Sequence, residues 1–374
     1  MILCDHVFKC KNIRNVGLSL TQPRTTHTIH PQLHMPPTRI FIRLSQNYEP
    51  LKMHIQDIYT IVEKDFENAN QLITTQLSSD VPLVEKIAEY IIESGGKRLR
   101  PLLVLLVSGA LGYKGQQHIK LATIIEFLHT ATLLHDDVVD TSDLRRGRST
   151  ANAKWGNAPS VLVGDFLYAR AFQMMVELKS LDIMHTLAEA TKVIAEGEVF
   201  QLTNCKNPDI TEENYFEVIR NKTAMLFEAA ASSTSNLCGA NADTAAALKE
   251  YGLQLGLAFQ LVDDMLDYTG NAETMGKNVG DDLAEGKPTL PLIQAMKTAN
   301  AEDRKLIRKA IRTGEASKLE EICKIVKACG ALEYTHAAAL QCQQAALASL
   351  SSLPDSEYKQ ALIGLVNLAV SRDK

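Results

Sequence analysis

From Met53 onward, hydrophobic positions recur with the spacing of amphipathic helices, and strand-like alternation is scarce. Nearly continuous apolar runs over 102–111, 119–134 and 253–262 predict helices that are buried on most sides. Glycine and proline positions separate the helical segments, and no repeat of solenoid length occurs. The pattern therefore predicts an all-α protein with a single domain over 53–374.

Local signals set further helix boundaries. Thr211 followed by two glutamates predicts a helix start. An apolar helix is predicted over 216–231, and Lys222 and Thr223 are polar residues within it. Another helix after Asp165 is expected to break near Lys179-Ser180, so that a second one returns antiparallel to it.

Residues 1–52 differ from the rest, because they hold seven lysines and arginines against two acids. A basic, acid-poor leader is typical of an organellar transit peptide. It is equally consistent with a disordered tail or with an upstream start codon that is not used. Because a well-patterned helix follows Met53, we favour the unused start and expect 53–374 to be the catalytic domain.

Composition narrows the class of protein. Hydrophobic residues make up 45% and charged residues 22%, and the net charge of −5 gives no indication of nucleic-acid binding. Seven cysteines form no CxxC pair, which favours a reducing compartment and a cytoplasmic location. No apolar run reaches the roughly 18 residues of a membrane span.

Two aspartate clusters with DDxxD spacing follow two of the apolar runs. They comprise Asp136, Asp137, Asp140, Asp263, Asp264 and Asp267. The first and last aspartates of such a box stack on one helix face, where like charges repel unless a cation lies between them. Hard oxygen donors suit Mg²⁺. One box alone is consistent with a solvated helix end, but two boxes predict a cage for several divalent ions around a diphosphate.

Basic residues lie near both boxes. Gly95-Gly96 permits a tight turn, and Lys97, Arg98 and Arg100 then open a helix, where cations oppose the helix dipole unless an anion binds. Further basic positions are Arg145, Arg146, Arg148, Lys222, Lys277 and Lys287, with Asp281-Asp282 between the last two. Each alone is an ordinary surface residue, whereas together they predict two diphosphates bound side by side.

Taken in order, these motifs resemble the trans-type polyprenyl diphosphate synthases, and most closely the bacterial octaprenyl-forming members of ubiquinone side-chain synthesis. The motifs are GGKRLRP, LLHDDVVD, DLRRGR, Lys222-Thr223, FQLVDDMLD and GDDLAEGKPTLP. The resemblance covers 53–374. It implies an isoprenoid-synthase helical bundle around a central cavity, a homodimer, and Mg²⁺-dependent addition of isopentenyl diphosphate to an allylic diphosphate such as farnesyl diphosphate.

The resemblance also implies roles for the motif residues. Two to three Mg²⁺ per active site would be held mainly by Asp136, Asp140 and Asp263, supported by Asp137, Asp264 and Asp267. The allylic diphosphate would be held by Arg145, Lys222, Thr223, Gln260 and Lys277. Isopentenyl diphosphate would be held by Lys97, Arg100, His129 and Arg146, and Lys287 is a further substrate-binding candidate. Metals and cations would stabilise the departing diphosphate, so Lys222 and Lys277 join Asp136, Asp140 and Asp263 as catalytic candidates.

Small residues before the first box indicate a long product. Ala131 and Thr132 stand where short-chain members of the family carry aromatics, so the hydrocarbon tunnel is expected to be open at that depth. Met175 and Leu187 would form its floor if the helices around Lys179-Ser180 are antiparallel. Because an isoprene unit spans about one helical turn of 5.4 Å, roughly eight units are expected to fit, giving an octaprenyl product.

Three alternatives compete with this interpretation. A class I terpene cyclase also ionises a diphosphate, but it does not need GGKRLRP or a second DDxxD. A di-iron carboxylate bundle requires paired ExxH motifs, which occur as Glu126 to His129 and Glu333 to His336, yet it leaves both aspartate boxes unexplained. A non-catalytic subunit of a heteromeric synthase would tend to lose aspartates that this chain keeps.

Overall fold

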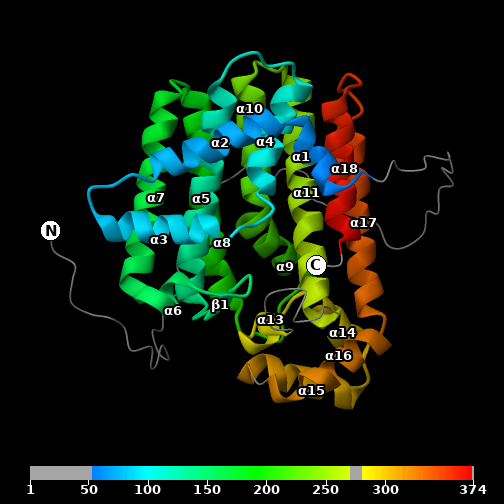
Figure 1. Ribbon diagram of the computed structural model, residues 1–374. Coiled ribbons are helices and arrows are strands. Elements are labelled where there is room, and N and C mark those ends of the chain that lie inside the picture. The colour runs from blue at the N-terminus through cyan, green and yellow to red at the C-terminus, as the bar shows by residue number, and fades with distance from the viewer. Residues whose placement is uncertain (1–52, 270–279, 315, 373–374) are drawn as a thin grey trace, which may run out of the picture. The chain divides into compact units, whose positions relative to one another are not determined.

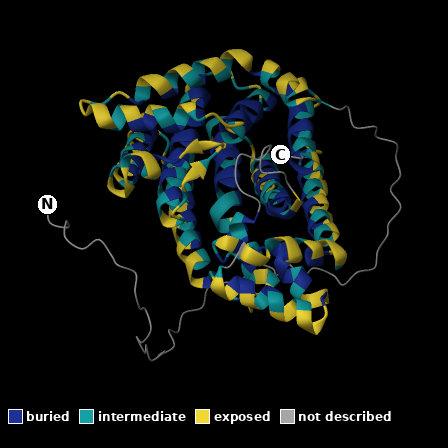
Figure 2. Ribbon diagram, turned by 60° about the horizontal axis from the view of Figure 1, so that its bottom comes forward, coloured by how far each residue is buried: buried dark blue, intermediate teal, exposed yellow. Residues whose placement is uncertain are grey.

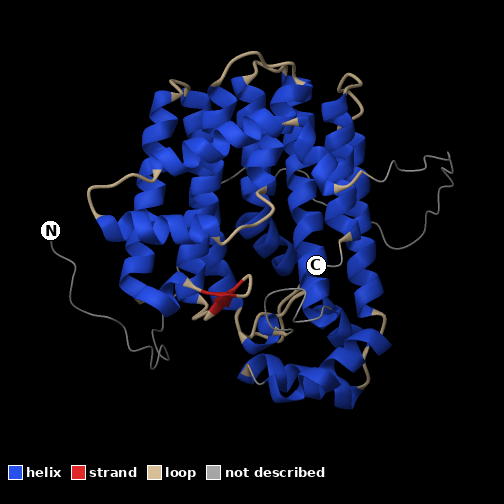
Figure 3. Ribbon diagram, viewed as in Figure 1, coloured by secondary structure: helices blue, strands red, loops and turns tan. Residues whose placement is uncertain are grey.

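The chain folds almost entirely into helices. The computed structural model describes residues 53–269, 280–314 and 316–372, and the structural statements below concern these residues; the leader 1–52 and Lys277 lie outside them. Figure 3 shows the helices with one short strand pair. The elements are α1 (Ile55–Ile61), α2 (Glu63–Gln76), α3 (Pro82–Glu93), α4 (Leu99–Ala110), α5 (Gln117–Val139), β1 (Leu144–Arg145), β2 (Arg148–Ser149), α6 (Ala151–Trp155), α7 (Asn157–Glu177), α8 (Leu181–Asn204), α9 (Glu212–Ile219), the π-helical turn η1 (Arg220–Ala224), α10 (Met225–Leu237), α11 (Ala242–Thr269), α13 (Asp281–Ala284), α14 (Leu290–Thr298), α15 (Ala301–Thr313), η2 (Ala316–Lys318), α16 (Leu319–Ala328), α17 (Ala331–Ser349) and α18 (Glu357–Ser371).

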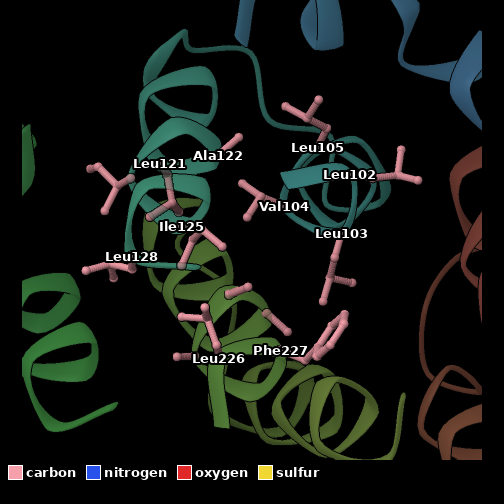
Figure 4. Close-up of a cluster of buried hydrophobic side chains, with 14 of the residues drawn as sticks. Leu102, Leu103, Val104, Leu105, Leu121, Ala122, Ile125, Leu128, Leu226 and Phe227 are labelled. Atoms are coloured by element: carbon pink, nitrogen blue, oxygen red, sulfur yellow. The ribbon is translucent and has the colours of Figure 1, made fainter. Parts of the chain in front are cut away.

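The core lies between long helices whose sequences are apolar on several sides. Every residue of 101–108 in α4 is buried, and α4 packs against α5 and α10. Figure 4 shows side chains of these three helices meeting, with Leu103 of α4 and Phe227 of α10 among them. Buried residues face inward and exposed ones outward around the bundle (Figure 2). The predicted buried helix over 102–111 and the apolar helix over 119–134 are thus confirmed.

The two box-bearing helices end in the same region of the molecule. α5 ends at Val139 and α11 at Thr269, next to the β1 hairpin and α13 at the lower end of the bundle in Figure 1. α5 packs along α7, and α11 packs against α10 and α17. Because the C-terminal end of a helix carries partial negative charge, carboxylates there are destabilised unless cations approach them.

Three of the predicted helix boundaries can be compared with the structure. The helix expected after Met53 is divided at Val62 into α1 and α2. The helix expected over 216–231 contains the π-helical turn at Lys222 and Thr223. The break near Lys179-Ser180 is confirmed, with Lys179 in a left-handed conformation (φ 55°) between α7 and α8.

The described residues from Met53 onward form one compact unit. Among their helices, none is long and apolar enough to cross a membrane. The division of the chain into 1–52 and 53–374 stays a prediction.

Candidate active site

A cavity of about 700 Å³ opens at the end of the bundle where α5 and α11 terminate. Most of the side chains predicted to be functional line it. These are Lys97, Arg100, His129, Thr132, Asp136, Asp140, Arg145, Arg146, Lys222, Thr223, Gln260, Asp263, Asp264 and Lys287. Sequence positions almost 200 residues apart therefore converge on one space.

In the first box only the outer aspartates line the cavity. Asp136 and Asp140 do so, whereas Asp137 is fully buried and points away. Asp137 Oδ1 accepts from Arg145 Nε at 2.8 Å and Nη2 at 2.7 Å. Burial raises the pKa of Asp137, and Arg145 opposes that rise. Asp137 thus positions Arg145 at the cavity rim.

In the second box Asp263 and Asp264 line the cavity, and Asp267 is fully buried behind them. Asp264 accepts hydrogen bonds from Tyr215 Oη at 2.6 Å and Gln260 Nε2 at 2.7 Å. Burial raises the pKa of Asp264 to about 8. The Asp267 carboxylate accepts the backbone N–H of Asp282 at 3.3 Å, so it fixes the start of α13.

Cations of the chain itself lie beside the carboxylates that line the cavity. Lys222 Nζ lies 3.9 Å from Asp136, and Lys287 Nζ lies 2.8 Å from Asp140 and 2.6 Å from Glu285. Arg372, at the end of α18, lies 3.3 Å from Asp263 and stacks over the Phe259 ring at 3.9 Å. The carboxylates thus create a region of negative potential that attracts positive charge.

The donor chemistry around the cavity suits a hard divalent cation, because carboxylate oxygens predominate. In residues 53–269, 280–314 and 316–372, however, no three His, Cys, Asp or Glu side chains lie close enough together to hold a metal ion. Lys222, Lys287 and Arg372 occupy the space next to the carboxylates. A metal ion bound at Asp136, Asp140 or Asp263 would share these carboxylates with the neighbouring cations.

Lys222 and Thr223 lie on the π-helical turn, a feature that often marks functional sites. Lys222 Nζ donates to Glu198 Oε2 at 2.8 Å and to Gln201 Oε1 at 2.9 Å, both on α8. Thr223 Oγ1 donates to Gln260 Oε1 at 2.9 Å, which connects the turn to the second box.

Two arginines of the GGKRLRP segment and one of DLRRGR line the cavity together, and we call them the arginine cluster: Arg98, Arg100 and Arg146. Arg100 Nη1 lies 3.3 Å from His129 Nε2, and its guanidinium stacks over Phe227 at 4.2 Å. Gly96 adopts φ 131°, and the Arg146 guanidinium fills the space that a side chain at Gly96 would need. The arginine cluster and the aspartates line the same cavity, so two anionic groups can bind in it together.

His129 stays neutral in the folded protein. Burial, together with the charges of Arg100, Arg146 and Arg145, holds the pKa of His129 well below its usual 6.5. A neutral imidazole can accept a hydrogen bond from Arg100 without adding charge to the cluster.

The pKa of His129 makes a pH-dependent stability testable. Below about pH 6.5 the unfolded chain binds a proton at His129 that the folded chain does not. The free energy of unfolding therefore decreases as the pH is lowered, by at most about 1.4 kcal/mol per pH unit. His129→Gln is expected to remove this part of the slope in urea unfolding between about pH 7.5 and 5.5. His185→Gln, at an exposed position, is the control. Equal slopes for wild type and His129→Gln would contradict the assignment.

The residues predicted to set product length lie at two depths. Thr132 lines the cavity, whereas Ala131, Met175 and Leu187 are fully buried in the core below it. α7 starts beside the first box, where Val161 O contacts His135 at 3.2 Å, and its other end meets α5 through Lys120 and Glu177. Met175 and Leu187 belong to one hydrophobic cluster, and their role as a floor stays a prediction.

The expected fit of eight units stays a prediction, and the lengths of α5 and α7 bear on the path that such a chain would take. From Val161 to Met175 helix α7 rises about 21 Å, whereas eight units of one helical turn each need about 43 Å. Even the full distance from Asp136 back to Gln117 along α5 is only about 29 Å. A chain of eight units must therefore bend or extend beyond the bundle.

Several cavity residues were not singled out from the sequence. They are Gln201, Phe259, Glu285 and Arg372, and Glu198, which accepts a hydrogen bond from the cavity residue Lys222, was missed as well. Glu198 and Gln201 had a usable signal, since polar residues at i and i+3 interrupt an apolar face of α8. Arg372 had none, because its proximity to Asp263 depends on how α18 packs against α11. Glu333 of the second ExxH motif is exposed and does not line the cavity.

Comparison with known proteins gives this geometry a family. The family described as "Polyprenyl synthetase" matches residues 81–329. The chain belongs to the polyprenyl synthetase family. The predicted family, the all-α fold and the enzyme class, a trans-polyprenyl diphosphate synthase, are therefore confirmed.

Individual members of the polyprenyl synthetase family are similar over most of the chain. An octaprenyl diphosphate synthase of Escherichia coli (strain K12) is 51% identical over 323 residues, covering 86% of this chain and 100% of the relative. An all-trans-nonaprenyl-diphosphate synthase (geranyl-diphosphate specific) of Rhodobacter capsulatus is 49% identical over 318 residues, covering 85% and 98%. The solved polyprenyl synthase of Caulobacter crescentus CB15 superposes with a TM-score of 0.84 at 43% identity, covering 86% of this chain and 99% of that one.

Proposed function

We propose that this enzyme adds isopentenyl diphosphate units to an allylic diphosphate, with farnesyl diphosphate as primer, and releases all-trans octaprenyl diphosphate for quinone side chains. The observation that carries the proposal is the single cavity in which Asp136, Asp140 and Asp263 accompany a separate arginine cluster. The octaprenyl length is supported by relatives of that name at 51% identity.

Divalent metal is expected to bind at the cavity aspartates. The Caulobacter crescentus structure is described as complexed with calcium and isoprenyl diphosphate, which supports a divalent cation here. We assign two to three Mg²⁺ to Asp136, Asp140 and Asp263, with Asp264 beside them. Asp137 and Asp267 support the site indirectly by holding Arg145 and the start of α13. When bound, the metals supply Lewis-acid stabilisation of a leaving diphosphate.

The chain's own residues divide the remaining work. Lys222, Arg145, Thr223 and Gln260 would hold the allylic diphosphate, with Lys287 and Lys277 as further cations. As the allylic C–O bond breaks, Lys222 is well placed to stabilise the departing anion, because Glu198 and Gln201 orient its ammonium.

Lys97, Arg100, His129 and Arg146 would hold isopentenyl diphosphate. Its C4 then forms a bond to the allylic C1, and the proton at C2 leaves to the departing diphosphate. The apolar side chains of Ile194 and Leu226 in the cavity wall would face the hydrocarbon and exclude water from the cation.

Product analysis tests the proposal directly. Purified enzyme with farnesyl diphosphate, labelled isopentenyl diphosphate and Mg²⁺ is expected to yield octaprenyl diphosphate, identified by chromatography of the dephosphorylated product. Products of nine or ten units would contradict the assigned length alone. Cyclic hydrocarbons would favour the terpene cyclase, bound iron would favour the di-iron bundle, and absence of condensation would favour a non-catalytic subunit.

Arg100→Ala tests the assignment of the isopentenyl diphosphate site. Loss of one charge-assisted contact should cost about 1.5–3 kcal/mol and raise KM for isopentenyl diphosphate by roughly ten- to a hundredfold. KM for the allylic substrate is expected to change little, and the exposed Arg312→Ala serves as control. A defect confined to the allylic substrate would show that the two sites are exchanged.

A homodimer is proposed from exposed apolar side chains on α7 and α8. These are Leu162, Phe172, Val176, Leu181, Val199 and Leu202. Light scattering on the purified enzyme tests this assembly. The cytoplasmic location, and the organellar alternative raised by the leader, remain predictions.

A further inference from the structure

A buried carboxylate, Glu126 on α5, lies within the arginine cluster and has no role in the function proposed above. Its side chain lines the cavity and is only 10% exposed. Oε1 lies 3.8 Å from Arg98 Nε, and Oε2 is buried without a hydrogen-bond partner. A carboxylate withdrawn from water in this way destabilises a protein unless surrounding charges compensate it.

Other contacts already orient the arginines around Glu126. Arg98 donates to the Asn70 side chain and to Ile92 O. Arg100 stacks over Phe227, and the Arg146 guanidinium lies against Gly96. The main effect of Glu126 is therefore electrostatic, because its carboxyl group places negative charge among the arginines. Burial raises the pKa of Glu126, and the charges of Arg98, Arg100 and Arg146 oppose that rise.

The reaction itself requires that this site release its anion repeatedly. In each addition the allylic diphosphate departs, and the lengthened product keeps the diphosphate that isopentenyl diphosphate brought. Before the next addition this group must leave the arginine cluster and enter the space between the aspartates. Guanidinium groups without a compensating negative charge would hold the diphosphate of the product more tightly, which slows such a transfer.

We infer that Glu126 weakens the hold of the arginine cluster on a diphosphate, so that the lengthened product moves to the aspartate side of the cavity between additions. The inference rests on the proposed function. Glu126 acts through Arg98, Arg100 and Arg146 and is therefore a positioning residue.

Glu126→Gln keeps the shape of the side chain and removes its charge. Calorimetric titration with isopentenyl diphosphate in metal-free buffer is expected to give a Kd about tenfold lower than that of wild type. Single-turnover formation of the first addition product should change little, whereas later additions slow and shorter products accumulate. If Glu126 had a purely structural role, the Glu126→Gln enzyme would bind isopentenyl diphosphate as tightly as wild type or more weakly. Either result overturns the inference.

Two further variants complete the test. Glu126→Asp withdraws the charge by one methylene group and is expected to lower Kd by about two- to threefold, which keeps the inference testable if Glu126→Gln does not fold. Glu89→Gln removes an exposed charge of the same kind on α3 and should match wild type. Wild type in the same assay separates the two proposals, because failure of its own elongation would refute the proposed function instead.

Discussion

Replacing Asp136 or Asp263 by asparagine is expected to lower kcat by about a thousandfold, equivalent to about 4 kcal/mol of transition-state stabilisation. The two carboxylates come from α5 and α11 and line one cavity. Each is paired with a cation, Lys222 at 3.9 Å and Arg372 at 3.3 Å, so each substitution removes a metal donor and also unpairs a cation. Steady-state rates over a Mg²⁺ titration measure the effect.

Controls separate loss of the metal site from loss of structure. Asp182→Asn, an exposed aspartate in the first turn of α8, should keep wild-type turnover. EDTA should abolish wild-type activity, and added Mg²⁺ should restore it. Near-normal kcat in either site variant, with unchanged circular dichroism, would refute the assignment of the aspartates as metal ligands.

A phenylalanine at Thr132 is expected to stop elongation after one or two additions, at about geranylgeranyl length. Thr132 lines the cavity about one helical turn, or 5.4 Å, below Asp136. An aromatic ring at this depth would fill the space that the growing hydrocarbon needs. Chromatography of the products measures the shift, and the melting temperature reports any overpacking, which costs about 1–3 kcal/mol.

Two companion variants make the result specific. Thr132→Val keeps the shape of the side chain, loses only the hydrogen bond to His129 O at 2.8 Å, and should leave product length unchanged. Met175→Ala, deeper in the core, is expected to shift products toward longer chains. Full-length product from a folded Thr132→Phe enzyme would show that the hydrocarbon leaves the cavity by another route.

The outcomes differ according to whether a feature depends on local or distant sequence. Apolar periodicity predicted α4 and α5 correctly, because burial of a helix depends on its own side chains. The DDxxD spacing identified the three aspartates of each box, but it could not tell which of the six face the cavity. Asp137 and Asp267 turn away because Arg145 and the backbone of α13 hold them.

Long-range contacts set the remaining part of the site. Arg372 reaches Asp263 across 109 residues of sequence, and Glu198 reaches Lys222 across 24. The depth of the hydrocarbon tunnel could not be derived from the sequence for a related reason. Counting helical turns along the sequence could not give the depth of the tunnel, because that depth depends on how α5 and α7 pack against each other.

The π-helical turn at Arg220–Ala224 gives this enzyme one residue more than a regular helix would use there. Val218, Lys222 and Leu226 line the cavity at intervals of four, which a 3.6-residue period alone would rotate apart. Deleting one residue of the turn would restore ordinary helical hydrogen bonding and turn Lys222 about 100° away from Asp136. Variants of this segment that are selected for thermal stability alone would therefore tend to have a regular helix and no activity. A screen of such variants has to measure the rate of product formation as well.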